Sequence, residues 1–92
     1  MSSTAPQPEF DVQPYVDYAK AYGLSIGLKY EPAIGTGSWN APTNLYAELS
    51  DETMKKNIRS RCDRLINEGF EYFYLNAEKQ SDGSYKLYIY YS

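Results

Sequence analysis

The side chains that most often carry out catalysis are scarce in this sequence of 92 residues. It contains no histidine, which removes the commonest general base and the commonest metal ligand. The single cysteine, Cys62, therefore has no histidine to activate it as a nucleophile, and zinc sites built from Cys and His cannot form. No Asp or Glu pair lies in an apolar stretch that would separate two carboxyl pKa values, and residues 35–37 lack the lysine of a phosphate-binding loop. We therefore predict a protein with no catalytic residues, no metal and no cofactor.

Tyrosine is the residue type that stands out, because it occupies eleven positions. Tyrosine offers a large rigid contact area with a polar tip, and it is enriched at protein interfaces. Ordinary β-propensity is an equally weighted explanation, in which the tail or a loop covers the rings. Stacking on nucleic-acid bases is a third use, which the acidic composition and the lack of an aromatic-glycine RNA-binding motif disfavour. The candidate partner-binding tyrosines share one face of an expected hairpin and are Tyr72, Tyr74, Tyr88 and Tyr90.

The charge of the chain is unevenly distributed. Its net charge is −3 and its isoelectric point is about 4.8, which argues against general affinity for DNA or RNA phosphates. Within ten positions, however, Asp63 is the only acid among five basic residues. A solvated helix face is the usual explanation of such a run, whereas the acidic remainder of the chain favours docking of an anionic partner, either phosphate or an acidic protein groove. The basic candidates for partner binding are Lys55, Lys56, Arg59, Arg61 and Arg64.

Two aromatic-rich, alternating runs between Phe70 and Tyr91 flank Ser81-Asp82-Gly83, which is the pattern of a β-hairpin. A two-residue Asp82-Gly83 turn would mix apolar and polar side chains on both faces. A three-residue loop with Gly83 in the left-handed conformation makes one face uniformly apolar. We therefore predict the pairs Phe73–Tyr91, Leu75–Ile89 and Ala77–Leu87 on the apolar face, and Tyr74–Tyr90, Asn76–Tyr88 and Glu78–Lys86 on the other.

Hydrophobic periodicity predicts two amphipathic helices. The first runs from a cap at Asp11 to a left-handed stop at Gly23, and the second runs from a cap at Ser50 to a stop at Gly69. The second helix is expected to bury a stripe that consists of Met54, Ile58, Cys62, Leu65 and Ile66.

Alternating patterns predict strands over residues 24–31 and 43–49, and a helix is the competing interpretation of the second of these. The glycines and prolines of residues 32–42 predict a loop between them. The only tryptophan, Trp39, lies in this loop. It either folds back onto the core, which we favour, or protrudes as an anchor for a partner.

The expected architecture is a single α+β domain over residues 11–92, behind a flexible tail over residues 1–10. The elements follow the order αββαββ, with an antiparallel sheet of about four strands and two helices packed on one of its faces. A lone cysteine fits a reducing compartment, and no run approaches the ~18 apolar residues that a membrane span needs. The first residues lack the basic and apolar regions of a signal peptide, so we expect a soluble protein that is not exported.

Read from MSSTAPQPEFDVQPYVDYAKAYGLSIGLKYE to FEYFYLNAEKQSDGSYKLYIYYS, the chain resembles a phage-encoded anti-CRISPR protein of the family numbered eighth among inhibitors of the type I-F system. The resemblance covers length and overall character rather than a motif, so it assigns no role to any residue. It implies a non-enzymatic inhibitor that binds Cas subunits of the crRNA-guided surveillance complex, with or without contact to the crRNA. Such an inhibitor would block recognition of target DNA, and it would act in the host bacterial cytoplasm as a monomer without a small-molecule ligand.

Two other functions stay open at this point. One is a binder of single-stranded nucleic acid that uses the tyrosine face, and the other is a structural or assembly protein of a virion. Binding to bare RNA or DNA would distinguish the first, and self-association would distinguish the second. An enzyme is the least favoured class.

Overall fold

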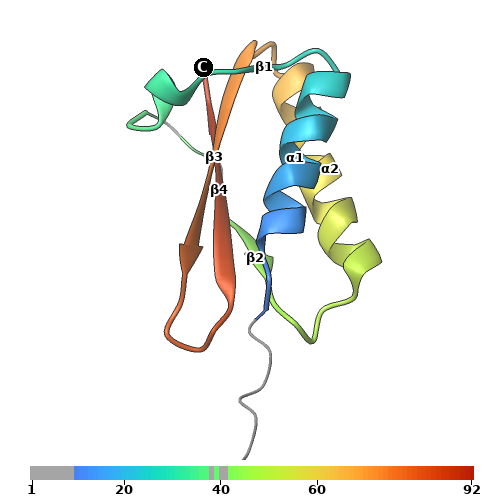
Figure 1. Ribbon diagram of the computed structural model, residues 1–92. Coiled ribbons are helices and arrows are strands. Elements are labelled where there is room, and N and C mark those ends of the chain that lie inside the picture. Colours follow the sequence, from blue (N-terminus) through green and yellow to red (C-terminus); the bar gives the residue numbers. More distant parts are fainter. Residues whose placement is uncertain (1–9, 38, 40–41) are drawn as a thin grey trace, which may run out of the picture.

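A computed structural model describes residues 10–37, 39 and 42–92. This part of the chain forms two layers, a four-stranded sheet and a pair of helices that both cover the same face of it (Figure 1). The α+β class, the αββαββ order and the placement of both helices on one face are therefore confirmed. In chain order the elements are α1 (Gln13–Ser25), β1 (Lys29–Tyr30), the 3₁₀ helix η1 (Pro32–Ile34), β2 (Thr43–Leu45), α2 (Asp51–Asn67), β3 (Tyr72–Lys79) and β4 (Tyr85–Tyr91).

The hairpin of β3 and β4 has the predicted register in every pair, including Leu75 opposite Ile89 and Tyr74 opposite Tyr90. Its loop is the predicted three-residue one. The Gln80 N–H donates to the Ser84 carbonyl at 2.8 Å, and Gly83 takes the left-handed conformation with φ of 88°. The demand for one uniformly apolar face was therefore sufficient to specify the register.

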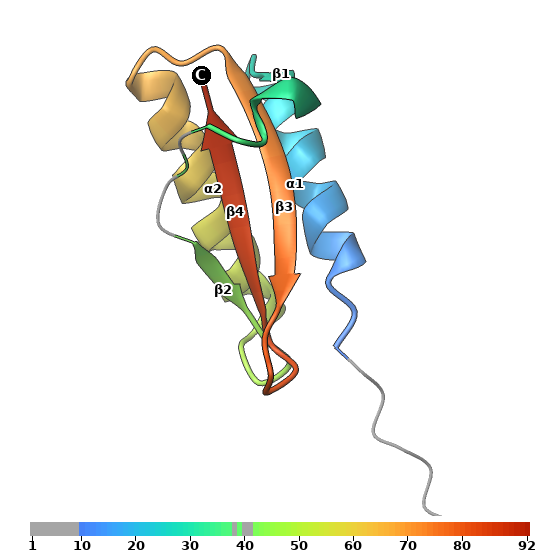
Figure 2. The same cartoon turned by 90° about the vertical axis from the view of Figure 1, so that its left-hand side faces the viewer.

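The edges of the sheet differ from the prediction. The strand order is β1-β3-β4-β2, so β1 and β2 lie at opposite edges. β2 runs antiparallel to β4, but β1 runs parallel to β3, and the prediction of a wholly antiparallel sheet was wrong at that edge. The chain does not turn back beside β1. It passes through η1 on the face of the sheet opposite the helices before it reaches β2 (Figure 2).

The first helix is longer than predicted, and the strand after it is shorter. Gly23 is buried within α1 instead of ending it, and a Cβ atom at this position would lie 2.5 Å from Cζ of Phe73. Gly23 is therefore required by the close approach of α1 to the sheet. The left-handed glycine is Gly27, with φ of 108°, and only Lys29 and Tyr30 of the predicted strand over residues 24–31 pair with β3.

The second helix agrees with the prediction except at one residue. The Thr53 N–H donates to Oγ of Ser50 at 3.1 Å, and Gly69 follows the helix with φ of 87°. Four members of the predicted stripe are buried, namely Met54, Ile58, Cys62 and Leu65. Ile66 is 39% exposed, because a residue directly after Leu65 is rotated by about 100° around the helix axis and lies beyond the stripe.

The strand predicted over residues 43–49 ends early. β2 covers only Thr43 to Leu45, with both of these side chains buried. The next residues form a turn, in which the Leu49 N–H donates to the Tyr46 carbonyl at 3.1 Å. Ala47, within the predicted strand, is exposed because the chain has already left the sheet.

The core lies between the helices and the inner face of the sheet, and it consists of Ala19, Leu28, Leu45, Met54, Ile58, Cys62, Leu65, Phe73, Leu75, Leu87 and Ile89. Phe10 packs against this core and stacks on Tyr15, with ring centroids 5.6 Å apart. The last residue of the predicted tail therefore belongs to the fold, and residues 1–9 lie outside the described residues. Neither described helix combines the length and the apolar character needed to cross a membrane.

Candidate protein-binding surface

Neither of the two helices covers the outer face of the sheet. The alternation of β3 and β4 that buries Phe73 and Leu87 directs the intervening side chains to this side. The four tyrosines that the sequence singled out lie on this side and each is half-buried, although Tyr72 lies at the end of the sheet and its ring contacts Lys29 instead of the other tyrosines. They are Tyr72 and Tyr74 on β3 and Tyr88 and Tyr90 on β4.

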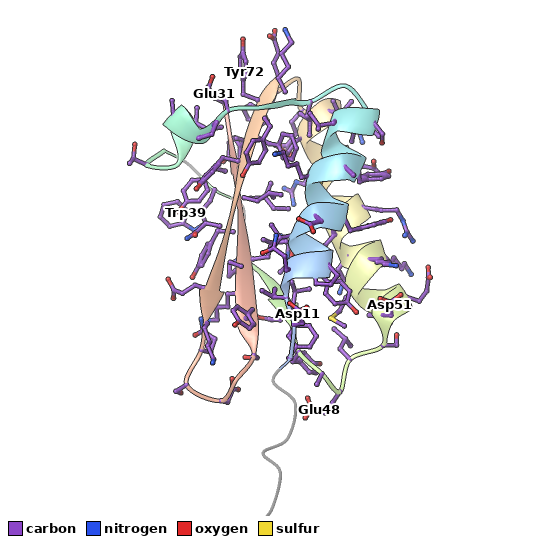
Figure 3. The ribbon with its side chains drawn as sticks, viewed as in Figure 1. Asp11, Glu31, Trp39, Glu48, Asp51 and Tyr72 are labelled. Carbon is purple, nitrogen blue, oxygen red and sulfur yellow. The ribbon has the colours of Figure 1, made fainter. Side chains whose placement is uncertain are left out.

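Trp39 lies across this face. A backbone bridge links it to Tyr90, and its ring centroid is 5.7 Å from that of Tyr90 and 6.1 Å from that of Tyr88. Tyr74 and Tyr90 are also in contact, at 5.9 Å. Trp39 is on the side of the sheet away from the helices (Figure 3) and is 52% exposed, so it has not folded back onto the core. We call the tyrosines Tyr72, Tyr74, Tyr88 and Tyr90, together with Trp39, the aromatic face.

Residues before Trp39 hold one part of the aromatic face in place. The Glu31 carboxylate accepts a hydrogen bond from the Ala33 N–H at 3.1 Å and caps η1. A Cβ atom at Gly35, just after η1, would lie 2.9 Å from the ring of Tyr74, so the turn packs closely on this tyrosine. The expectation that a loop covers the tyrosines is therefore correct for Tyr74, whereas Trp39 adds apolar area that solvent reaches.

Tyr30, which is not among the partner-binding tyrosines predicted from the sequence, extends the aromatic contacts to the sheet edge. Its ring contacts Phe73 at 5.3 Å and Tyr74 at 5.5 Å, and the Lys20 ammonium lies 4.4 Å from its centroid. Burial raises the pKa of the Tyr30 hydroxyl above its usual value, so the ring is neutral at physiological pH. The alternating pattern over residues 24–31 predicted a strand that includes Tyr30, but only the pairing of β1 with β3 places Tyr30 beside Tyr74.

The surroundings of the aromatic face are polar and of mixed charge. The Lys29 ammonium lies 5.9 Å from the Tyr72 ring, and Glu78 is opposite Lys86 on the two hairpin strands. An apolar aromatic centre with a polar rim is the usual anatomy of a protein interface.

Cys62 is poorly suited to covalent chemistry. The side chain is buried in the core, and burial raises the pKa of the thiol to about 12. Because the thiolate is the reactive form, the residue is inert at neutral pH. Among the described residues, no group of three or more Cys, Asp or Glu side chains is arranged to hold a metal ion.

The five basic residues of α2 do not form one patch. Lys55 and Arg59 lie on the side of α1, where the Lys55 ammonium is 5.3 Å from the Tyr18 ring and Arg59 donates to the Tyr18 hydroxyl at 2.9 Å. Arg61 and Arg64 lie on the opposite side, towards β2. These basic residues are close together in the sequence, but the structure divides Lys55 and Arg59 from Arg61 and Arg64.

Three of these cations have acidic partners on α2 or directly after it. Lys55 pairs with Asp51 at 3.3 Å, Arg59 pairs with Glu52 at 3.3 Å, and Arg64 donates to Glu68 at 2.7 Å. Their positive charge is therefore partly neutralised. Lys56 and Arg61 form no ion pair or hydrogen bond within the described residues, and they are the basic side chains best placed to meet an external anion.

A comparison of this chain with models of protein families, with curated proteins and with solved structures found no match. The case for a function therefore rests on the surfaces of the chain itself. Of these surfaces, the aromatic face contains Trp39, which at 52% has the highest exposed fraction among the large hydrophobic side chains of the described residues, in contact with Tyr88 and Tyr90.

Proposed function

We propose that this chain is a non-enzymatic binding module that covers a surface of a partner protein with its aromatic face. The observation that carries this proposal is Trp39, which is held against Tyr88 and Tyr90 and is still 52% exposed. A tryptophan is a costly residue to leave in water, and clusters of exposed aromatic side chains mark interaction sites. Tryptophan and tyrosine are also the residues that most often dominate the free energy of a protein interface.

As partner we propose a crRNA-guided type I-F surveillance complex, whose recognition of target DNA the bound chain would block. The choice of partner rests on the resemblance given under Sequence analysis. The acidic composition of the chain supports it, since a net charge of −3 suits surfaces whose lysines and arginines otherwise hold DNA. The rigid sheet beneath the aromatic face also supports it, because a preformed surface loses little conformational entropy on binding.

The test compares Trp39→Gln with Leu24→Gln in binding to purified type I-F surveillance complex. The two variants are matched, because Leu24 is 49% exposed at the end of α1, in the helix layer, and receives the same substitution. Removal of a central aromatic anchor is expected to raise Kd by about tenfold or more, whereas Leu24→Gln leaves Kd within about twofold. Surface plasmon resonance on the immobilised complex provides both values, and circular dichroism checks that both variants are folded.

The possible outcomes test the proposed interface and the proposed partner independently. If wild-type protein binds and Trp39→Gln and Tyr88→Thr bind equally well, the aromatic face is not the interface. If wild-type protein does not bind the complex, the proposed partner is wrong. Gel shifts with bare RNA and DNA at physiological salt complete the test, since binding there would favour the use of the aromatic face for stacking on bases.

A further inference from the structure

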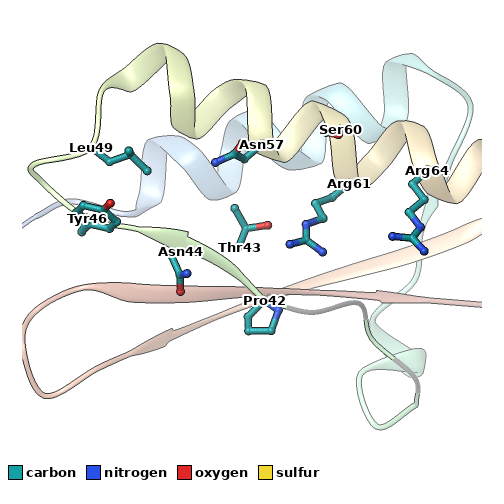
Figure 4. Close-up of a pocket in the computed structure, with 9 residues that line it drawn as sticks. All are labelled: Pro42, Thr43, Asn44, Tyr46, Leu49, Asn57, Ser60, Arg61 and Arg64. Atoms are coloured by element: carbon teal, nitrogen blue, oxygen red, sulfur yellow. The ribbon is translucent and has the colours of Figure 1, made fainter.

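A second surface, separate from the aromatic face, is a groove between the edge strand β2 and the helix α2 (Figure 4). It has a volume of about 590 Å³, which is within the range of ligand-binding clefts. Two arginines and no acidic residue line it. The lining residues are Pro42, Thr43, Asn44, Tyr46, Leu49, Asn57, Ser60, Arg61 and Arg64.

The two arginines can supply charged donors to the groove. Arg61 makes no ion pair or hydrogen bond within the described residues, and its guanidinium points towards β2 (Figure 4). Arg64 uses its Nε to donate to Glu68 at 2.7 Å, and its terminal nitrogens also point towards the sheet. A guanidinium with free donors is the side chain best suited to hold a carboxylate in two parallel hydrogen bonds.

A buried hydroxyl of the groove lacks a hydrogen-bond partner. Thr43 is 3% exposed, and its Oγ1 atom has no partner among the described residues. The oxygen points towards Arg61 (Figure 4). Buried polar atoms nearly always have a hydrogen-bond partner. The presence of threonine instead of valine at position 43 therefore indicates that a bound molecule supplies the partner of this hydroxyl.

The open edge of β2 adds backbone groups to the same groove. Tyr72 and Ser92 exchange two hydrogen bonds across the hairpin, so the even-numbered residues of β4 bond to β3 and the odd-numbered ones point to β2. Thr43 and Leu45 are opposite odd-numbered residues and therefore bond to β4. The N–H and C=O groups of Asn44, between them, point away from the sheet. An unpaired strand edge of this kind is a template for an added strand.

We propose that this groove binds an acidic segment of a partner protein in extended conformation. The backbone of the segment pairs with Asn44 on the β2 edge, and one carboxylate accepts hydrogen bonds from Arg61 and from the Thr43 hydroxyl. A peptide fits better than a nucleic acid because the groove offers strand-edge backbone groups beside its two guanidinium groups. The acidic remainder of the chain would also repel a phosphate backbone that continues beyond the groove. This site does not depend on the aromatic face or on the partner proposed for it.

The test titrates the full-length ¹⁵N-labelled chain with the peptide acetyl-Val-Glu-Val-Glu-Val-amide. The expected result is a saturable shift of the Asn44 backbone amide resonance. The same peptide with Gln in place of both Glu residues is expected to bind about tenfold or more weakly, because the charge-assisted hydrogen bonds are lost. Inorganic phosphate at equal ionic strength serves as the probe for a site that only requires an anion.

Three variants connect the binding to the groove. Arg61→Gln is expected to weaken binding of the glutamate peptide by about tenfold or more, and Thr43→Val by about threefold to tenfold. Lys56→Gln is the matched control and is expected to leave affinity unchanged. Lys56 is an exposed cation of the same helix, it has no ion pair with any described residue, and it does not line the groove. The proposal would be overturned if the two peptides bound equally well, or if Arg61→Gln and Lys56→Gln lost the same affinity. It would also be overturned if phosphate bound as tightly as the peptide, or if no binding occurred at millimolar peptide.

Discussion

The two faces of the β3–β4 hairpin are built from the same strands, yet they are filled in different ways. The centre of the inner face is formed by Phe73, Leu75, Leu87 and Ile89, each at most 4% exposed beneath the helices. The outer face carries four tyrosines that are only half-buried, and contacts join Tyr74 to Tyr90 and Trp39 to Tyr88 and Tyr90. Alternation alone requires the first set to be apolar, but it requires nothing so large and aromatic of the second.

The difference separates stability from binding. Side chains of the inner face are fully removed from water in the isolated chain, so most of the hydrophobic stabilisation arises there. Side chains of the outer face keep area that only a partner can remove from water. Substitutions on the inner face should therefore change the free energy of unfolding, whereas those on the outer face should change affinity.

The largest effect is expected from Phe73→Ala, at the centre of the inner face. Phe73 is completely buried and packs against Gly23 and Tyr30, so its removal leaves a cavity. The free energy of unfolding should fall by about 3–5 kcal/mol. Urea denaturation measures it, with Tyr88→Thr as the outer-face comparison, for which a loss below about 1 kcal/mol is expected because threonine retains β-propensity. Similar losses in the two variants would remove the distinction between the faces.

The second effect concerns the contact between α1 and the inner face. Gly23→Ala improves helix propensity by about 1 kcal/mol, but its Cβ would lie 2.5 Å and 2.7 Å from two ring atoms of the fully buried Phe73. Overpacking should outweigh the gain and lower the free energy of unfolding by about 1–3 kcal/mol. Adding Phe73→Leu should make the Gly23→Ala change less harmful, and a double-mutant cycle by urea denaturation measures this coupling. If the two changes are additive, α1 does not approach the sheet as closely as the structure shows.

The loop and register of the hairpin could be predicted from the sequence because they depend on residues that are close together in the chain. Three residues specify the loop, and one choice of register makes a face apolar. The parallel edge formed by β1 could not be predicted in this way, since Lys29 and Tyr30 pair with residues more than forty positions away. The prediction that Gly23 ends the first helix was wrong for a related reason. A glycine at the end of a helical pattern resembles a stop, and only the neighbouring Phe73 reveals that it is a packing residue.

The same distinction applies to the candidate sites. Strand alternation and register were sufficient to place the four tyrosines on one face of the hairpin, where Tyr74 and Tyr90 are in contact and Trp39 contacts Tyr88 and Tyr90. The basic residues of α2 were treated as one cluster, although their spacing already separates Lys55 and Arg59 from Arg61 and Arg64 around the helix. The groove between α2 and β2 was not foreseen, because it depends on how the edge strand is placed against the helix.

The third prediction concerns Thr43, the buried polar residue of the inner side. Thr43→Val removes a hydroxyl without a partner and keeps the shape of the side chain, so the free energy of unfolding should rise by about 1 kcal/mol. Thr36→Val, an exposed position, is the control and should change it little. Denaturation of both variants by urea measures the difference. A loss of stability in Thr43→Val would mean that the hydroxyl already has a hydrogen-bond partner in the isolated chain and is not available to a bound peptide.

The smallest effect depends on pH and concerns how the helices are joined over the inner face. The Asp51 carboxylate accepts a hydrogen bond from the Tyr15 hydroxyl at 2.8 Å and pairs with Lys55 at 3.3 Å. The hydrogen bond from Tyr15, followed by the one from Lys55, lowers the pKa of Asp51 below its usual value of 3.8. Because the pKa is lower in the folded state, this stabilisation is fully present above pH 3.8 and is lost as the pH falls through the folded pKa.

Asp51→Asn should therefore be less stable than wild type at pH 7, and the difference should shrink on acidification below about pH 4. Tyr15→Phe should reduce the same pH-dependent difference, because it removes the main cause of the lowered pKa. Urea midpoints of the three proteins between pH 7 and pH 2.5 provide the measurement. A difference between wild type and Asp51→Asn that stays constant over this range would show that the Asp51 carboxylate does not help to hold α1 and α2 together. The two helices would then be held together by apolar packing and by the other hydrogen bonds between them, from Arg59 to the Tyr18 hydroxyl and from the Tyr22 hydroxyl to Asp63.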